Sequence, residues 1–290
     1  MIKISFELYP EDGRIKPYEH PFGYVFRGLI MEWLHNIEPK LVHEYHSYGK
    51  VRPYSIHSII YDKVPKIEFN LITFDNNLKE SLLKDIIKQE NPKFKLGQKN
   101  YYIGKIYFET INLRKIFDDS KPITSFKIKF ITPTYFSTSL GDYPVRFPLP
   151  SLLFGNLAKI WNTISERTGD IDTDRFINWI NAHVYASFYK LIVKKRLIGK
   201  PQPVYGCAGY CNYKVQKINK LFYKKLLEEE NREYDYEYVN EDYLNNCRWL
   251  EILCKIGEYT NVGTNRTAGL GVIRYYPYKY VNKEILIGTE

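Results

Sequence analysis

The chain begins with Ile2-Lys-Ile-Ser-Phe-Glu-Leu-Tyr-Pro10 and repeats the same pattern at Phe126-Lys-Ile-Lys-Phe-Ile-Thr-Pro133. In both stretches apolar and polar residues alternate until a proline ends the alternation. A period of two is typical of a β-strand with one buried face, because successive side chains point to opposite sides of the backbone. The same signal at two distant places indicates that two similar units follow one another.

Each strand signal is followed by a loop and then by a helix with one apolar face. The apolar residues at helical spacing are Phe22, Phe26, Leu29, Trp33 and Ile37 in the first half and Leu153, Leu157, Ile160, Trp161 and Ile164 in the second. Pro21 and Pro150 stand near the helix starts, where proline is favoured because the first N–H groups of a helix have no partner.

The remaining elements follow the same order in both halves. The predicted elements are strands at 66–72, 101–105 and 106–112 around a helix at 78–88, then a helix at 150–165, strands at 183–193 and 204–215, a helix at 243–256 and a last strand from Val272. This order resembles the strand-helix-strand-strand-helix-strand arrangement of a ferredoxin-like domain. An acidic stretch at 228–242 is interpreted as a solvated insertion.

The predicted fold class is α+β, with two tandem ferredoxin-like (RRM-like) domains and a basic cleft between them. Residues 118–122 read Asp-Asp-Ser-Lys-Pro and form the natural linker. We therefore expect an N-terminal domain at 1–121 and a C-terminal domain at 122–290. Open-faced domains of this kind suit RNA, but the fold alone does not give the function.

The composition favours an anionic partner. The 290 residues include 42 Lys and Arg against 33 Asp and Glu, which gives a formal net charge of +9. A basic balance of this size is typical of proteins that bind nucleic acid. The 27 tyrosines fit this interpretation, because tyrosine stacks on bases, although tyrosine also fills cores.

The sequence shows no signal for a membrane or for a metal. No apolar run reaches the roughly 18 residues that cross a bilayer, and the N-terminal strand pattern is unlike a signal peptide. We therefore expect a cytoplasmic protein without membrane contact. The cysteines lack the spacing of a zinc knuckle and are interpreted as reduced structural thiols, so neither a metal nor a cofactor is expected; they are Cys207, Cys211, Cys247 and Cys254.

The stretch Gly257-Glu-Tyr-Thr-Asn-Val-Gly-Thr-Asn-Arg-Thr-Ala-Gly-Leu-Gly-Val272 has little side-chain bulk. It joins a helix pattern to a strand pattern. Glycines gather where the backbone turns sharply or another molecule comes close, and such a loop can hold a phosphate against peptide N–H groups. A helix-to-strand turn without a ligand explains the same residues, so the loop alone leaves both interpretations open.

The segment 39–55 gathers two histidines and two cations. Its first residue, a proline, is predicted to open a short helix on which His43 and His46 share a face. Lys50 and Arg52 follow within a few residues. Histidine exchanges protons near neutral pH, and a cation stabilises a phosphate that gains charge in a transition state. These groups suffice for RNA cleavage through the 2′-hydroxyl, and they fit a protein that only binds as well.

Of the remaining histidines, His35 lies off the apolar face of the first helix and is expected to face solvent. His20, His57 and His183 stand in strand or loop contexts with no convergent partner. The acidic residues show no pairing that resembles a metal nuclease. The segment 39–55 is therefore the candidate catalytic segment.

Four stretches together resemble one family. They are Arg27-Gly-Leu-Ile30 with Trp33-Leu34, His46 through Arg52-Pro-Tyr-Ser55, Thr132-Pro-Thr134 with Phe147-Pro-Leu-Pro150 and Trp161-Asn162, and Gly257-Glu-Tyr259 through Val262-Gly263 to Gly269-Leu-Gly271. In this order they resemble the CRISPR-associated endoribonucleases that cut precursor RNA at its repeats, members of the repeat-associated (RAMP) superfamily. Each stretch is short, and their common order over most of the chain makes the resemblance specific.

The resemblance implies a metal-independent cleavage by 2′-hydroxyl attack, which leaves a 2′,3′-cyclic phosphate and a 5′-hydroxyl and generates guide RNAs. His46 matches the family's histidine, with His43 as the alternative. Lys50 or Arg52 stands at the position of the phosphate-stabilising lysine. Met31 departs from the pattern, because some members carry a tyrosine there and methionine cannot donate to a phosphate.

The resemblance also implies which residues hold RNA. The implied RNA-binding residues are Gly263, Arg266, Thr267, Gly269 and Gly271 of the loop, together with Lys194, Arg196 and Lys200, which a solvated strand end explains equally well. The implied partner is CRISPR repeat RNA, with effector-complex subunits and a second copy of the chain as further candidates. A non-catalytic RNA-binding subunit of a CRISPR effector complex is the alternative function.

Overall fold

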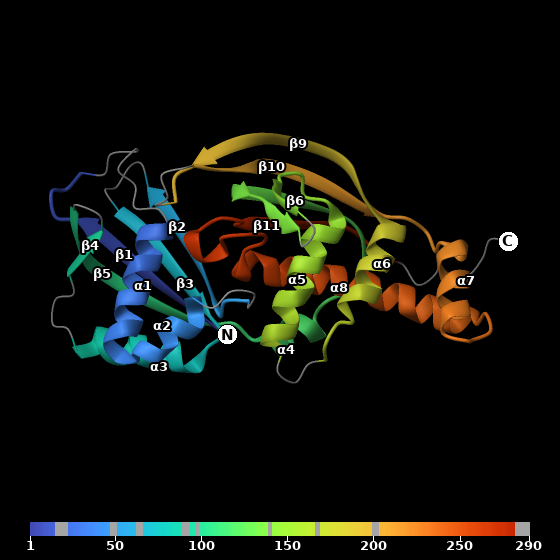
Figure 1. Ribbon diagram of the computed structural model, residues 1–290, viewed down its shortest axis with the longest axis horizontal. Coiled ribbons are helices and arrows are strands. Elements are labelled where there is room, and N and C mark those ends of the chain that lie inside the picture. The colour runs from blue at the N-terminus through green and yellow to red at the C-terminus, as the bar shows by residue number, and fades with distance from the viewer. Residues whose placement is uncertain are drawn as a thin grey trace.

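The computed structural model contains two large antiparallel sheets, each with helices on one face, that lie beside one another along the long axis of the molecule (Figure 1). The structure describes residues 1–14, 23–46, 51–61, 66–88, 93–96, 99–138, 141–165, 169–198 and 203–281.

The first half forms a five-stranded sheet in the order β2-β3-β1-β5-β4. Its elements are β1 (Ile2–Pro10), α1 (Gly23–Ile37), α2 (Pro39–His46), β2 (Tyr54–Tyr61), β3 (Lys66–Thr73), α3 (Asn76–Lys88), β4 (Lys93–Leu96) and β5 (Lys99–Thr110). The alternating pattern of β1 buries Ile4, Phe6 and Leu8 against Phe26 and Ile30 of α1. The predicted helix start at Pro21 and Phe22 lies outside the described residues.

The second half forms a four-stranded sheet in the order β11-β6-β10-β9 and a small sheet of β7 and β8. Its elements are α4 (Leu113–Asp118), β6 (Ile123–Thr134), β7 (Phe136–Thr138), β8 (Gly141–Val145), α5 (Pro150–Ile164), α6 (Thr173–His183), β9 (Val184–Arg196), β10 (Val204–Val215), α7 (Lys220–Glu229), α8 (Tyr236–Thr260), the 3₁₀-helix η1 (Arg266–Ala268) and β11 (Ile273–Tyr280).

Both halves share one strand order. In each half the first strand lies between the third and the last, in the runs β2-β3-β1-β5 and β9-β10-β6-β11, and all these neighbours pair in antiparallel fashion. This is the ferredoxin-like order. The predicted fold class, an α+β protein with two tandem ferredoxin-like domains, is confirmed.

The core of the second domain lies between its sheet and the helices α5 and α8. All five apolar residues predicted on α5 are buried there. The helix α4 packs against the same core, and the ring of its Phe117 lies 5.5 Å from the ring of Trp249. The four cysteines are buried free thiols, as predicted, and burial raises the pKa of the Cys207 thiol to about 12.

Several element boundaries differ from the sequence-based expectation. Residues 54–61 form the unpredicted strand β2, and most of 101–112, predicted as two strands, belongs to the single strand β5. The helix α6 was also not predicted, although Asp172 caps it by accepting the N–H of Arg175 at 3.1 Å. A capping aspartate is a helix signal that the sequence does carry.

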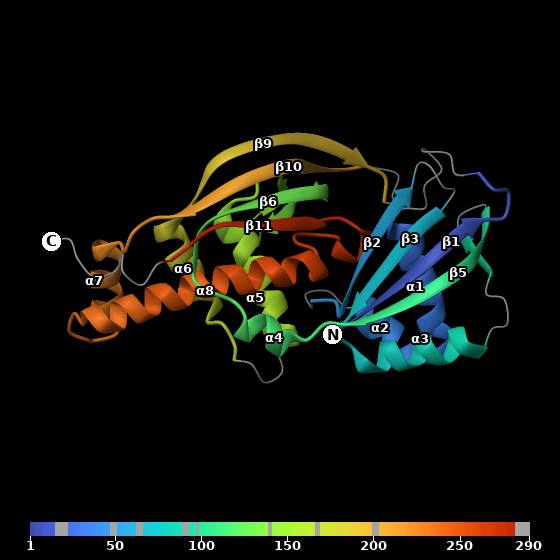
Figure 2. The ribbon, with the colours of Figure 1, turned by 180° about the vertical axis from the view of Figure 1, so that it is seen from behind.

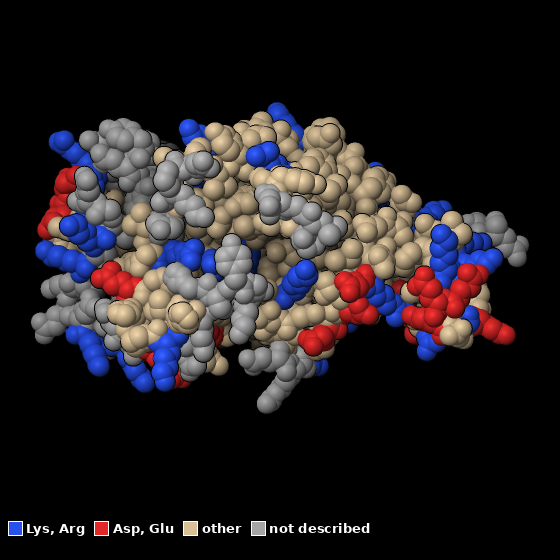
Figure 3. All heavy atoms as spheres, in the orientation of Figure 1, with Lys and Arg blue, Asp and Glu red and all other residues tan. Residues whose placement is uncertain are grey.

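Most of the acidic stretch at 228–242 is exposed, as expected of a solvated insertion. It forms the end of α7 and the beginning of α8, at the end of the molecule where Asp and Glu gather on the surface (Figure 3). Arg175 of α6 lies 3.0 Å from Asp242 and 3.4 Å from Glu230. Two of these carboxylates hold the helices α7 and α8 against α6, which the sequence did not predict.

Candidate functional site

The glycine-rich loop, residues 261–272, joins α8 to β11 through left-handed backbone. Gly263 and Gly271 have φ angles of 76° and 73°, a region that favours glycine. A Cβ at Gly263 would meet the carbonyl oxygen of Tyr135, and a Cβ at Gly271 would meet that of Val262. These two glycines therefore allow the loop to fold tightly against the end of β6.

The loop is fastened to the first domain at the beginning of β2. Arg266 donates through Nη2 to the Arg52 carbonyl at 3.2 Å, and Asn261 donates through Nδ2 to the Ile56 carbonyl at 2.9 Å. Arg52 donates in turn through Nη1 to the Thr267 hydroxyl at 3.1 Å. We call these five residues the domain junction. It brings together two segments more than 200 residues apart in the sequence.

Arg266 is the buried centre of the domain junction. Its side chain is only 7% exposed, and Nη1 donates to the Thr260 carbonyl at 2.6 Å. Burial, followed by the charge of Arg52, lowers the pKa of the Arg266 guanidinium to about 10, so it remains a cation at neutral pH. A buried cation needs acceptors for its N–H groups, and backbone carbonyls from both domains supply them.

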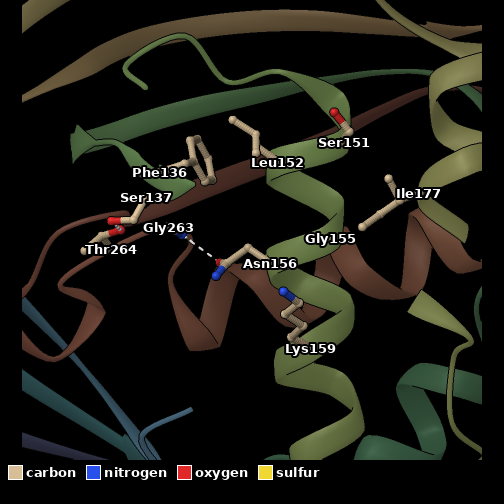
Figure 4. A pocket seen from close by; sticks show the side chains of 10 residues that line it. All are labelled: Phe136, Ser137, Ser151, Leu152, Gly155, Asn156, Lys159, Ile177, Gly263 and Thr264. Carbon is tan, nitrogen blue, oxygen red and sulfur yellow. Dashed lines mark hydrogen bonds between the residues drawn. The ribbon is translucent and has the colours of Figure 1, made fainter. Parts of the chain in front are cut away.

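A groove runs along the domain junction between the loop and α5. One cavity of about 280 Å³ is lined by Ser137, Asn156, Lys159 and Gly263, among others (Figure 4). A second cavity of about 330 Å³ shares Ser137, Asn156 and Gly263 with the first and extends to Arg52. The Asn156 side chain accepts the N–H of Gly263 at 2.8 Å and so holds the loop on α5. We call the two cavities together the junction groove.

The junction groove has the chemistry of an anion site. Lys159 lines one of its two cavities and Arg52 the other, and no Asp or Glu occurs among its described lining residues. The hydroxyls of Ser137 and Thr264, which line both cavities, lie 3.1 Å apart. Cations and hydroxyls without a carboxylate suit a phosphate.

Family relationships agree with this geometry. The sequence profile of the CRISPR-associated endoribonuclease Cas6 family matches residues 128–273, about half of the chain. This chain belongs to the Cas6 family. The matched part begins within β6, contains α5 and the glycine-rich loop, and ends at the first residue of β11. The resemblance to CRISPR RNA-processing endoribonucleases predicted from four short stretches is thereby confirmed.

Solved Cas6 structures share the whole fold. A Thermus thermophilus Cas6 in a product complex matches with a TM-score of 0.72 and 14% identity, over 94% of this chain and 99% of that chain. A second Cas6, also in a product complex, matches with a TM-score of 0.69 and 14% identity over 95% and 99% of the two chains. The same protein with a substrate mimic gives 0.66 and 13% over 95% and 99%. No curated relative matches the chain.

The first domain supplies the histidine segment of this Cas6 protein. As predicted, a short helix, α2, begins at Pro39 and ends at His46, and His43 is exposed on it. Lys50 and the side chain of His46 lie outside the described residues. Arg52 follows His46 by six residues and is fixed at the domain junction. Since six residues span at most about 20 Å, the end of α2 lies within that distance of Arg52.

The loop residues predicted to hold RNA have different positions. Gly263, Arg266 and Thr267 line the junction groove. The side chains of Arg266 and Thr267 are engaged in the domain junction and are buried. Gly269 ends the helix η1 with a φ of 76°, and Gly271 shapes the loop. RNA contact by these residues stays a prediction.

The cations predicted at the end of β9 lie near the same loop. Lys194 is exposed, and burial lowers the pKa of the half-buried Arg196 guanidinium. Ile198, which follows β9, packs with Leu270 of the loop. Lys200 lies outside the described residues. The end of β9 therefore reaches the glycine-rich loop, which the sequence did not predict.

Sequence reasoning missed two residues of the junction groove, Asn156 and Lys159. They lie three residues apart on α5, next to the buried apolar residues Leu157 and Ile160. That polar pair is the signal that could have found them, because residues three apart share a helix face. Met31, the departure from the family pattern, packs against the core of the first domain.

Two histidines outside the candidate segment have partners that the sequence did not show. Nε2 of buried His183 accepts the N–H of Asn219 at 3.2 Å, so Nδ1 carries the proton and donates to the Trp179 carbonyl at 2.9 Å. For His57 on β2, burial and then the charge of Arg274 on β11 lower the pKa to about 4. His183 is thus held by backbone groups in the core of the second domain, and His57 lies near Arg274 of the other sheet.

None of the helices in the described part of the chain is long and apolar enough to cross a membrane.

Proposed function

We propose that this Cas6 protein cleaves CRISPR precursor RNA within its repeats without a metal ion and so generates guide RNAs. The 2′-hydroxyl attacks the adjacent phosphate and the 5′-oxygen leaves, which gives a 2′,3′-cyclic phosphate and a 5′-hydroxyl. The observation that carries the proposal is the junction groove. Its described lining has cations and no carboxylate, and Arg52 of the histidine segment lies within it.

The two domains have separate roles in this proposal. In the first domain, residues 1–121, His46 transfers the protons, with His43 as the alternative, and Lys50 and Arg52 stabilise the phosphate as its charge grows. The bond from Arg52 to Thr267 fixes the direction of the Arg52 guanidinium. A cation held in place before the reaction stabilises a transition state without reorganisation.

In the second domain, residues 122–290, the junction groove holds the RNA backbone. Lys159, Ser137 and Thr264 lie along it, and Lys194 and Arg196 of β9 extend the positive surface beyond the loop. Lys200 is proposed as a further contact with the RNA. The matched solved Cas6 proteins in product and substrate-mimic complexes support RNA as the ligand. Effector-complex subunits and a second copy of this chain are proposed as partners of the protein, and the cytoplasm as its location.

Single-turnover cleavage of a repeat RNA from the protein's own array tests the proposal. His46→Ala should slow the reaction about 100-fold or more, since general acid–base catalysis contributes roughly that much, and should leave the RNA dissociation constant within about twofold. His35→Ala is the matched control, because His35 is an exposed histidine of α1. Full activity in His46→Ala and in the double variant with His43→Ala would contradict the histidine assignment.

The chemistry has its own test. A 2′-deoxy substitution at the scissile nucleotide should abolish cleavage, and EDTA should leave the rate unchanged. A rate that requires added divalent metal would contradict the metal-independent mechanism. Tight repeat binding by the wild-type protein without any cleavage would instead support the alternative function, a non-catalytic RNA-binding subunit of an effector complex.

A further inference from the structure

The second sheet presents two rows of side chains on the face opposite its core. The pairing register places Tyr276, Lys127, Asn212 and Phe188 side by side across β11, β6, β10 and β9, and places Arg274, Lys129, Tyr210 and Lys190 in the next row. Paired residues of neighbouring antiparallel strands share a face. Their sequence neighbours Phe126, Ile128 and Tyr213 are buried in the core. We call these eight residues together with Tyr278 the open face.

The open face looks toward the viewer in Figure 2, where α5 lies behind the four strands. Its aromatic rings are accessible, since Phe188 is 56% exposed, Tyr278 52% and Tyr276 40%. Large rings gathered on a surface mark a binding site more often than single exposed apolar residues do.

A cation stands at the centre of these rings. Nζ of Lys127 lies 4.5 Å from the ring centre of Tyr276, 5.7 Å from that of Tyr278 and 6.0 Å from that of Tyr210. The ring of Phe188 lies 6.0 Å from the ring of Tyr210. The rings and the cation thus form one continuous patch across all four strands.

The charge of the open face is uncompensated on its own sheet. None of the four strands contains an Asp or Glu. Lys127, Lys129 and Lys190 form no ion pair within the described part of the chain. Cations interleaved with accessible rings match a ligand that alternates phosphates with flat bases.

The geometry points to a second RNA site on the open face, which binds unpaired nucleotides. Their bases stack on Tyr276, Tyr278 and Phe188, and their phosphates lie against Lys127 and Lys129. The ligand is a single strand, because the bases of a duplex are stacked on one another and cannot reach the rings. That the ligand is RNA rests on the proposed function, whereas the site itself needs neither His46 nor cleavage.

This site is distinct from the junction groove. The groove lies between the loop, α5 and Arg52, on the helix side of the second domain, and it shares no residue with the open face. One repeat RNA can therefore occupy both, with a cleaved segment in the groove and an unpaired segment on the sheet.

Binding of a fluorescein-labelled twelve-nucleotide oligouridine tests the inference, because this RNA forms no hairpin. The double variant Tyr276→Leu/Tyr278→Leu should bind it about tenfold or more weakly, since loss of base stacking costs roughly a kcal/mol or more per base. Tyr107→Leu is the matched control. Tyr107 is 50% exposed and lies on the corresponding face of the first sheet, where it pairs with Ser5.

Several outcomes would overturn the inference. They are unchanged affinity in the double variant, an equal loss in Tyr107→Leu, and binding of wild-type protein to phosphatidylserine vesicles that the double variant loses while it keeps its RNA affinity. Crosslinking guards against a misfolded variant: wild-type protein irradiated with 4-thiouridine RNA should carry the nucleotide on the peptide that contains residues 273–280. Crosslinks confined to other peptides would equally overturn it.

The same experiments separate this inference from the proposed function. Wild-type protein that cleaves a minimal repeat hairpin but does not bind oligouridine would refute the RNA site on the open face and leave the proposed nuclease function intact. Wild-type protein that binds oligouridine through the tyrosines but cleaves no repeat RNA would refute the nuclease alone.

Discussion

The two sheets of this protein share one strand order and differ in the chemistry of the face opposite their helices. On the first sheet the charges are paired, with Lys66 2.6 Å from Glu7 and Lys3 3.5 Å from Glu109. On the second sheet no strand carries an acidic residue, and Lys127 lies over tyrosine rings. Strand order decides where a side chain points, and the residue type at that place decides what the face can bind.

The two domains also differ in the role that their sheets play. The polar groups of the first sheet satisfy one another, as when Ser5 donates to Asn70 at 2.5 Å and Asn70 to Glu68 at 3.1 Å. A satisfied face is a stable support for the histidine segment. The second domain keeps its cations available and so accounts for most of the affinity that we propose for RNA.

The largest expected effect is on the second domain's loop. Gly271→Ala should lower the free energy of unfolding by on the order of 3 kcal/mol, because a Cβ there meets the Val262 carbonyl at a φ of 73°. Urea unfolding measures it. Gly28→Ala in α1 is the matched change in the first domain, where a Cβ has open space, and it should stabilise by about 0.5–1 kcal/mol. A similar loss of stability in both variants would contradict the expected difference between these two glycines.

The next largest effect is expected from a variant that breaks the link between the domains. Arg266→Ala leaves the carbonyls of Thr260 and Arg52 without their donor, and should cost about 1–3 kcal/mol of stability. It should also slow cleavage more than it weakens RNA binding, because the Arg52 segment loses its anchor. Comparison of the single-turnover rate with the dissociation constant checks this. Arg248→Ala is the control, because its guanidinium donates to the carbonyls of Phe117 and Ser120, in the segment that links the two sheets and outside the domain junction. An equal fall of both quantities in Arg266→Ala would refute the anchoring role.

A smaller effect is a pH dependence where the sheets meet. Burial and Arg274 lower the pKa of His57 to about 4, against a weaker opposing effect of Glu68 and with Lys3 adding to the lowering. The unfolded chain therefore binds more protons than the folded one between about pH 4 and 6.5, and stability falls as the pH drops through this window. We expect a loss of about 1–2 kcal/mol between pH 7 and pH 5. His57→Gln should remove this loss of stability, as measured by urea unfolding at pH 7 and pH 5. An unchanged loss in the variant would contradict the assignment of the pH dependence to His57.

The smallest effect concerns single charges on the two sheets. Lys129→Ala should weaken RNA binding a few-fold and reduce the slope of log K against log salt by about 0.7, the value for one phosphate contact on a single strand. Lys3→Ala on the first sheet should leave both unchanged, because Lys3 pairs with Glu109. Titration of labelled RNA at several salt concentrations measures both. An equal change of slope in the two variants would contradict the proposed difference in RNA binding between the two sheets.

Much of the fold could be predicted from local sequence. In β1, β6 and α5 the spacing of apolar residues along the sequence shows which face is buried. The ferredoxin-like order could therefore be predicted from these elements. Strand β2 was missed because its first two residues, Tyr54 and Ser55, were interpreted as part of the histidine segment, and residues 56–61 were assigned to no element. The packing of the acidic stretch at 228–242 against α6 could not be predicted, because the partner of Asp242 is Arg175, 67 residues away in the sequence.

The site was less predictable than the fold. The glycine-rich loop and the histidine segment were both identified, but nothing local shows that Arg266 donates to a carbonyl 214 residues away. Arg266 was predicted at an RNA surface, and its burial depends on a tertiary contact that no spacing encodes. The pairing of Lys127 with three tyrosines likewise depends on strand register, which the sequence leaves open.

The domain junction has a consequence for how this protein can diverge. Arg266 and Asn261 recognise the first domain through the carbonyl oxygens of Arg52 and Ile56, and every amino acid carries a carbonyl. Substitutions at the beginning of β2 therefore leave these two bonds intact. The segment that we propose to be catalytic can exchange its side chains over generations while the two domains keep their orientation.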